Sequence, residues 1–138
     1  MRIEELIIGD WVNQKMNDGA YQVQWIEREI VGLIKHTGTE EDGSIHLTAV
    51  PLECISPIPL TAEILVKNGF ECIDVDDLHC SHYRYENMEL LKWDGWVFWK
   101  FAIHNNGIFA NILECRVSYI HQLQHALRLA GVEKEIDV

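Results

Sequence analysis

Residues 89–131 have the sequence ELLKWDGWVFWKFAIHNNGIFANILECRVSYIHQLQHALRLAG and contain the strongest fold signals in the chain. The dipeptides Asp94-Gly95 and Asn106-Gly107 favour two-residue hairpin turns, because their residues readily adopt a positive φ. The apolar residues around both dipeptides alternate with a period of two, which is typical of β-strands. This stretch therefore predicts a three-stranded antiparallel meander that is followed by one helix.

The two predicted turns also set which residues face each other. The first turn opposes Leu91 with Phe98, and the second opposes Phe101 with Ile112. One face of the meander then carries a continuous apolar set, namely Met88, Leu90, Val97, Trp99, Phe101, Ile103, Ile108, Ala110 and Ile112. The other face mixes charged residues with aromatic ones such as Trp96. We expect this second face to be covered by the rest of the chain, by a second copy or by a partner.

The predicted C-terminal helix has Ser118 as its N-cap and Gly131 at its C′ position. Apolar residues at helical spacing form one stripe that we expect to pack on the sheet, namely Tyr119, Ile120, Leu123, Ala126, Leu127 and Ala130. The polar residues His121, Gln124, His125 and Arg128 lie on the opposite side, which we expect to be exposed. Residues 132–138 predict a frayed acidic tail.

The N-terminal part of the chain predicts a second, separate set of strands. Five short apolar segments lie near residues 10–12, 21–25, 31–36, 45–47 and 53–55. They suggest a small SH3-like β-barrel lobe. Pro57 and Pro59 then interrupt the pattern, so we predict two lobes, residues 1–56 and 57–138, in one compact unit. Thr61 begins a short helix that ends at Gly69, and the fold class is α+β.

Composition limits the functions that the chain can have. The formal net charge is −11, from 22 acidic and 11 basic residues, which opposes direct binding to nucleic acid or to an anionic membrane. Residues 1–11 lack the apolar core of a signal peptide, and no apolar run is long enough to span a bilayer. The four cysteines show no framework spacing. They predict buried free thiols and a cytoplasmic location.

Three segments carry a resemblance to a known family. They are IGDWV at residues 8–12, ISPIPLTAEILVKNGFE at 55–71 and VSYIHQLQHALRLAG at 117–131. The chain resembles a family of short uncharacterised proteins from gut anaerobes and from their phages and mobile elements. Members share a Pro-Ile-Pro-Leu-Thr-x-Glu helix start and a His-Gln-Leu-Gln helix. The resemblance covers most of the chain except residues 74–86. It implies a compact domain and a mobile-element context, and it implies no catalytic residues.

The most metal-like cluster is formed by His79, Cys80 and His82, because His and Cys are good zinc ligands. No paired CxxC or HxxxH motif clearly completes this cluster. His121 and His125 are one helical turn apart, but no glutamate lies between them in an HExxH pattern. We therefore interpret the cluster as an ordinary loop and assign no metal and no cofactor.

These observations favour a non-enzymatic binding or assembly module with a protein partner or a second copy of itself. Two sets of residues form the candidate interaction surface, namely His121, Gln124, His125 and Arg128 on the helix, and Trp96 and Phe98 on the meander. One alternative is a small metal-dependent hydrolase that uses His79, Cys80 or His82 with His121 or His125. Another is an acidic nucleic-acid mimic that inhibits a DNA-binding enzyme.

Overall fold

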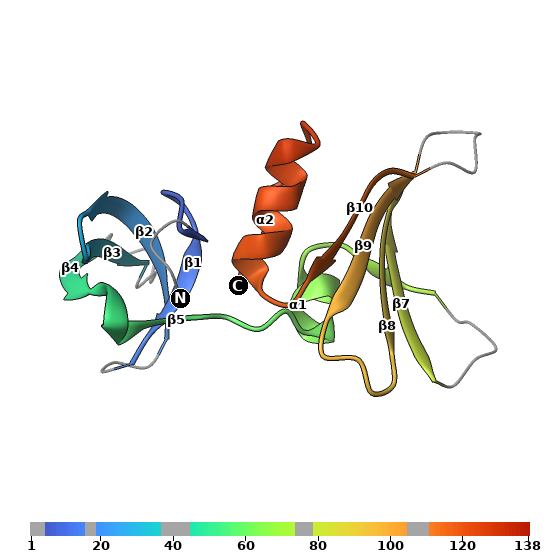
Figure 1. Ribbon diagram of the computed structural model, residues 1–138, viewed down its shortest axis with the longest axis horizontal. Helices are drawn as coiled ribbons and strands as arrows, with labels where there is room; N and C mark the ends of the chain where they lie inside the picture. The colour runs from blue at the N-terminus through green and yellow to red at the C-terminus, as the bar shows by residue number, and fades with distance from the viewer. Residues whose placement is uncertain (1–4, 16–18, 37–44, 74–78, 105–110) are drawn as a thin grey trace. The chain divides into compact units, whose positions relative to one another are not determined.

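The computed structural model describes residues 5–15, 19–36, 45–73, 79–104 and 111–138 (Figure 1). The chain divides into two compact units, residues 1–58 and 59–138. Each unit contains one five-stranded antiparallel sheet, and helices α1 and α2 both belong to the second unit. The predicted α+β class is therefore confirmed. The units meet between Ile58 and Pro59, inside the proline-containing segment that was expected to separate the lobes.

The first unit has an open sheet. Its strands follow the order β4-β3-β2-β1-β5 and are β1 (Trp11–Gln14), β2 (Ala20–Glu27), β3 (Ile30–His36), β4 (Ile45–Pro51) and β5 (Ile55–Pro57). Among the described residues β4 and β5 lie at opposite edges and do not pair, so the predicted barrel is wrong. A barrel needs two edge strands that are long and tilted enough to meet. β5 has only three residues, and all three pair with β1.

Alternating residues of these strands form the core of the first unit. The buried cluster consists of Leu6, Val12, Tyr21, Val23, Val31, Leu33, Val50 and Ile55. An irregularity in the pairing of β2 with β3 places Trp25 opposite Gly32. A Cβ atom at position 32 would lie 2.2 Å from the Trp25 indole ring. The glycine therefore allows this ring to lie against the backbone of β3.

The second unit has a larger sheet than the predicted meander. Its strands follow the order β10-β9-β8-β7-β6 and are β6 (Glu71–Cys72), β7 (Cys80–Tyr85), β8 (Met88–Trp93), β9 (Trp99–His104) and β10 (Asn111–Val117). The predicted strands correspond to β8, β9 and β10. The start of β7, at Cys80 and His82, was predicted to be a loop. Its pairing with β8 nevertheless makes it a strand.

The pairing of β8 with β9 differs from the predicted register by two residues. Leu91 pairs with Lys100 instead of Phe98. Only Gly95 of the predicted turn has a positive φ, 84°, so the turn is not the expected two-residue type and the loop is longer. An even shift keeps every paired residue on its predicted face. Met88, Leu90, Phe101 and Ile103 are accordingly buried, whereas Val97 lies in the loop and is 86% exposed.

The pairing of β9 with β10 differs by an odd number of residues. Phe101 pairs with Cys115 instead of Ile112. An odd shift moves side chains to the opposite face, so the predicted faces of β10 are wrong. Val117 is buried, and Glu114 and Arg116 are exposed on the other face.

An irregularity between Asn111 and Leu113 accompanies this shift. A bulge of this kind adds a residue to one strand, and a dipeptide turn signal does not reveal it. The predicted Asn106-Gly107 turn and the predicted core residues Ile108 and Ala110 lie outside the described residues.

Helix α1 (Ala62–Lys67) has the predicted ends. The Thr61 hydroxyl oxygen accepts a hydrogen bond from the Ile64 amide at 3.3 Å, so Thr61 is the N-cap. At the other end Gly69 has a φ of 88°, and the Phe70 amide donates to the Leu65 carbonyl at 3.0 Å. These features form a Schellman motif, which confirms the predicted helix end.

Helix α2 (Ile120–Leu129) begins one residue later than predicted. Tyr119 is its N-cap, because the Gln122 side-chain oxygen accepts hydrogen bonds from the amides of Ser118 and Tyr119 at 2.7 and 3.2 Å. Gly131 has a φ of 75° and takes the predicted C′ position. The predicted stripe is buried at Ile120, Leu123, Ala126 and Leu127, whereas Tyr119 is half-buried and Ala130, which was expected to pack on the sheet, is exposed. Figure 1 shows α1 and α2 on the same side of the second sheet.

The C-terminal segment is bound to the second unit, so the predicted frayed tail is wrong. Ile136 is only 2% exposed. The Gln124 side chain accepts a hydrogen bond from the Ile136 amide at 2.7 Å and donates one to the Lys134 carbonyl at 3.0 Å. The Asn68 side chain makes two hydrogen bonds of 2.8 Å with the backbone of Asp137. Two amide side chains, Gln124 on α2 and Asn68 at the C-cap of α1, therefore hold the segment by its backbone.

Candidate binding surface on the second sheet

The side of the second sheet that faces away from α1 and α2 is called the outer face here. Cross-strand pairing places residues from four strands on it, namely His82, Arg84, Glu89, Leu91, Lys100, Ala102, His104, Glu114 and Arg116. This face mixes charged and apolar residues, as the sequence predicted for the second face of the meander. Both helices of the unit lie on the other side (Figure 1).

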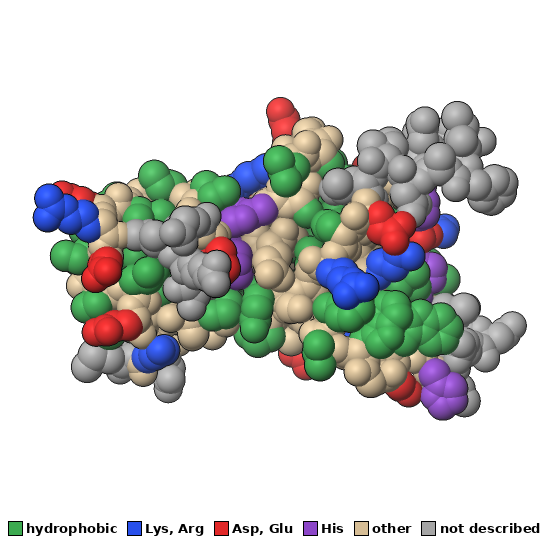
Figure 2. Space-filling view, viewed as in Figure 1, with side chains coloured by type: hydrophobic (Ala, Val, Ile, Leu, Met, Phe, Trp, Pro, Cys, Tyr) green, Lys and Arg blue, Asp and Glu red, His purple; other side chains and the backbone are tan. Residues whose placement is uncertain are grey.

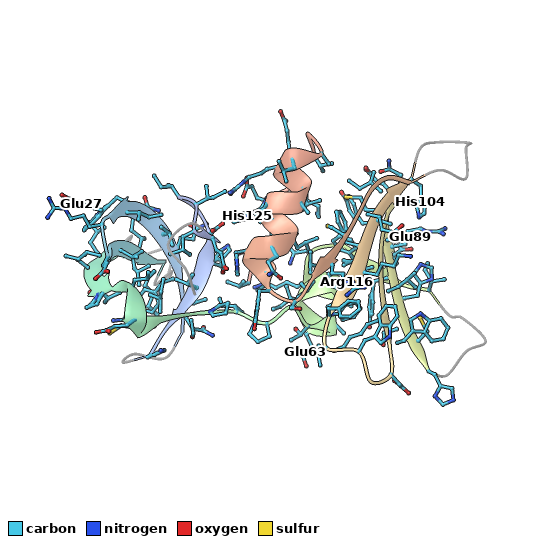
Figure 3. The ribbon with its side chains drawn as sticks, viewed as in Figure 1. Glu27, Glu63, Glu89, His104, Arg116 and His125 are labelled. Atoms are coloured by element: carbon cyan, nitrogen blue, oxygen red, sulfur yellow. The ribbon has the colours of Figure 1, made fainter. Side chains whose placement is uncertain are left out.

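A hollow of about 320 Å³ lies at the β9–β10 side of the outer face, and we call it the aromatic–basic hollow. Its lining residues are Trp96, Phe98, Lys100, Glu114, Cys115 and Arg116. The rings of Trp96 and Phe98 are stacked, with centroids 4.8 Å apart. The Arg116 guanidinium carbon lies 4.7 Å from the Phe98 centroid. Figure 2 shows Lys and Arg side chains beside hydrophobic ones in the second unit, and Figure 3 labels Arg116.

The loop after β8 positions the aromatic side of this hollow. Gly95 turns the chain, and the Trp96 amide donates to the Trp93 carbonyl at 3.0 Å. The Ser118 hydroxyl donates to the Val97 carbonyl at 3.3 Å and ties the loop to the start of α2. Trp96 and Phe98 therefore project from a loop that is bonded at both ends. This arrangement depends on the long turn, which the dipeptide pattern did not predict.

The basic side of the hollow comes from neighbouring strands. Lys100 on β9 forms an ion pair with Glu114 on β10, with an N–O distance of 3.0 Å. Arg116 is the next outward residue of β10, and it stacks on Phe98. A guanidinium held over an aromatic ring keeps its N–H donors available, because they point outward in the plane of the guanidinium. Sequence reasoning missed Lys100 and Arg116, because the β9–β10 register brings them together.

A second polar cluster lies around Glu89 on the same face. Its carboxylate accepts hydrogen bonds from Arg84 at 2.6 Å and from His104 at 2.7 Å, and the His82 ring nitrogen lies 3.5 Å away. Burial alone raises the pKa of Glu89, but these hydrogen bonds and the nearby histidine charges outweigh burial and hold the pKa below its ordinary value of 4.5. The cluster, labelled at Glu89 and His104 in Figure 3, therefore stabilises an ionised carboxylate.

The residues that the alternative metal-dependent hydrolase would need do not converge. His79 lies 3.1 Å from Asp94 at the start of β7, whereas Cys80 and His82 belong to that strand and not to a loop. His82 lies beside Glu89 on the outer face, away from His121 and His125 on α2. Within residues 5–15, 19–36, 45–73, 79–104 and 111–138, no group of three or more His, Cys, Asp or Glu side chains is arranged to hold a metal ion.

The helix residues that were predicted to form an exposed interaction surface are only partly accessible. His121 and Gln124 are 2% and 4% exposed, so their predicted exposure is wrong, whereas His125 and Arg128 are half-buried. The His121 ring stacks near Tyr119, with centroids 5.8 Å apart, and Gln124 holds the C-terminal segment. The helical wheel treated the sheet as the only packing partner of α2. The C-terminal segment is a second packing partner, and it covers part of the face that was expected to be exposed.

All four cysteines are free thiols, but they are not buried as predicted. Cys72 is exposed, and Cys54, Cys80 and Cys115 are half-buried. Cys72 lies in β6, which has only two residues and forms the edge of the sheet. Burial raises the pKa of Cys115, which lines the aromatic–basic hollow. A raised thiol pKa lowers the fraction of the reactive thiolate.

No protein-family model, curated protein or solved structure matches this chain. In the part of the chain that the structure describes, no helix is long and apolar enough to cross a membrane. The proposal below therefore depends on the side chains of the outer face.

Proposed function

We propose that this chain is a non-enzymatic binding module that uses the aromatic–basic hollow to bind an acidic segment of a protein partner. The single observation that carries the proposal is an aligned set of three side chains: the Arg116 guanidinium carbon lies over the Phe98 ring, 4.7 Å from its centroid, and the Phe98 ring stacks on Trp96 with centroids 4.8 Å apart. Trp and Arg are the residue types that most often dominate the energy of protein interfaces. A prearranged guanidinium also pairs well with a carboxylate through two hydrogen bonds.

Charge complementarity supports an acidic partner. The chain as a whole has a net charge of −11, yet the hollow carries Lys100 and Arg116 against a single carboxylate, Glu114. A positive site on a negative protein steers an acidic segment to one place on its surface and repels it elsewhere. The same argument disfavours tight self-association through this hollow, since two copies with a charge of −11 repel each other.

The alternative functions receive less support. A metal-dependent hydrolase needs converging ligands, and His79, Cys80 and His82 do not converge with His121 or His125. An acidic nucleic-acid mimic needs carboxylates in regular rows, and the outer face alternates Glu89 and Glu114 with basic side chains. The binding module is therefore our preferred function.

Three finer features belong to the same proposal. The strand order of the first unit and the 3₁₀ turn at Leu52–Cys54 before β5 support an SH3-like order of strands in an open sheet that is not a closed barrel. The free thiols support a cytoplasmic location. The Pro-Ile-Pro-Leu-Thr-x-Glu and His-Gln-Leu-Gln segments support an origin in a phage or mobile element.

A selection from a library of random peptides tests the binding function. The immobilised full chain should enrich peptides that contain clustered Asp or Glu residues. The Arg116→Glu variant should bind the selected peptides at least about tenfold more weakly, which corresponds to roughly 1.4 kcal/mol. Lys15→Glu makes the same charge change at an exposed site of the first unit and should bind as the wild type does.

Melting temperatures of both variants should stay close to that of the wild type, because both side chains are exposed. Enrichment of peptides without acidic residues, an absence of enrichment, or equal binding by Arg116→Glu would show that the hollow is not the binding site.

A further inference from the structure

A second hollow, of about 480 Å³, lies where the start of α1 meets the loop between β8 and β9. Three of the five tryptophans of the chain line it, namely Trp93, Trp96 and Trp99. Its polar lining residues include Thr61, Ser81, Lys92 and Asp94. We call it the tryptophan hollow. Its volume falls in the range of about 300–1,000 Å³ that is usual for small-molecule sites.

The three tryptophans of this hollow differ in their exposure and in the contacts that hold them. Trp99 is 5% exposed, and its indole N–H donates to the Leu60 carbonyl at 3.1 Å. Its ring is therefore held in place at the base of the hollow. Trp96 is held by its stack on Phe98. Trp93, at the end of β8, is 40% exposed and leaves much of its ring area in water. Exposing a large aromatic ring costs hydrophobic free energy, which a ligand that stacks on the ring can recover.

The polar lining selects the charge of a ligand. The Lys92 ammonium lies 5.7 Å from the Trp99 centroid, where it repels an organic cation that would otherwise use the aromatic lining. The Asp94 carboxylate, which lies 3.1 Å from His79, repels an anion. One cation and one anion on the same lining therefore favour a neutral ligand.

The same side chains can satisfy many hydroxyl groups. The Lys92 ammonium donates, the Asp94 carboxylate accepts, and the Ser81 hydroxyl does both. The Thr61 hydroxyl already accepts from the Ile64 amide and keeps its O–H as a donor. A ligand with hydroxyl groups around its rim thus finds both donors and acceptors, whereas a purely apolar ligand would leave these groups without hydrogen bonds.

We propose that the tryptophan hollow binds a neutral saccharide of one or two sugar rings. One face of a sugar ring presents mainly C–H groups, and their slight positive charge suits the negative face of an indole ring. The hydroxyl groups project from the rim of the sugar, towards the positions of Lys92, Asp94 and Ser81. The two hollows share Trp96, but Trp93 and Lys92, on which the saccharide proposal is tested, do not line the aromatic–basic hollow.

The test uses the full chain on an array of neutral, acidic and amino sugars, followed by calorimetric titration with the neutral sugars that bind. The Trp93→Ala variant should lose at least about tenfold in affinity, and Lys92→Gln should lose less because it keeps an N–H donor. Trp25→Ala is a matched control, because Trp25 is also 40% exposed but belongs to the first unit. It should bind sugars as the wild type does.

Near-ultraviolet circular dichroism should show that both Trp93→Ala and Lys92→Gln remain folded. If Trp93→Ala fails to fold, the Lys92→Gln comparison alone decides, and an unchanged affinity then contradicts the proposal. The proposal is also wrong if no neutral sugar binds above the Trp93→Ala background, or if only nucleosides, quaternary ammonium ions or acidic sugars bind.

Discussion

Glu89 shows how one side chain stabilises the second sheet through its neighbours. Its carboxylate connects three strands, because Arg84 belongs to β7, Glu89 to β8 and His104 to β9. The side chain of Glu89 is 14% exposed, so water screens these interactions less than at an open surface. Removing its partners would leave a partly buried charge without compensation and would lower the free energy of unfolding.

The Glu89 carboxylate makes stability depend on pH. Its pKa in the folded state is below the ordinary value of 4.5, so the stabilisation is present above pH 4.5 and is lost as the pH falls through the folded-state pKa. Glu89→Gln should therefore lower the free energy of unfolding at neutral pH and weaken its decline below pH 4.5. Urea unfolding at a series of pH values measures both effects.

The exposed Glu63 provides a control for that experiment. Glu63→Gln should follow the wild-type pH curve. The same decline with acid in Glu89→Gln as in the wild type would mean that this cluster does not contribute to acid sensitivity.

The strands and helices show which predictions from local sequence patterns agree with the folded structure. The register of β8 with β9 shifted by two residues and kept its faces, whereas that of β9 with β10 shifted by an odd number and exchanged them. Both helices ended at the glycines that the pattern predicted, Gly69 and Gly131. At its other end, α2 uses Gln122 for capping, and Ser118 bonds to a neighbouring loop instead.

Helix α2 should also control the order of the C-terminal segment. Gln124→Leu removes both side-chain hydrogen bonds to this segment, at Lys134 and Ile136. Each such bond contributes roughly 0.5–1.5 kcal/mol, so we expect a loss of about 1–3 kcal/mol. The Ile136 amide should exchange with solvent faster, as measured by hydrogen–deuterium exchange.

Gln24→Leu makes the same change in the first unit and should leave exchange at Ile136 unaltered. Unchanged protection of the Ile136 amide in Gln124→Leu would show that burial of the Ile136 side chain alone holds the segment.

The whole molecule combines a strongly acidic balance with a local basic site. The net charge is −11, while Lys92, Lys100 and Arg116 lie at the two hollows of the second unit. Lys100 is paired with Glu114, so the local excess of positive charge is small. A few basic side chains can orient one acidic segment but cannot neutralise the many phosphates of a duplex.

We therefore expect no binding to duplex DNA at physiological ionic strength. An electrophoretic mobility shift assay with random-sequence DNA measures this directly. A shift that weakens as salt is added would contradict the expectation, because it would show that phosphate contacts release counterions.

Features that depend on neighbouring residues were predictable from the amino-acid sequence. Period-two alternation identified β8 and β9 and their buried faces, and Gly69 and Gly131 located the C-terminal ends of both helices. These signals are local because backbone preferences and side-chain spacing act within a few positions.

Features that depend on distant partners became visible only in the folded chain. β7 becomes a strand by pairing with β8, and Asn68 holds Asp137 across 69 positions of the chain. The shifted pairing of β9 with β10 brings Arg116 to Phe98. Gln124 is buried because the C-terminal segment packs on it, and a helical wheel of α2 does not include that segment. Both hollows are therefore products of long-range hydrogen bonding and packing, which local patterns do not encode.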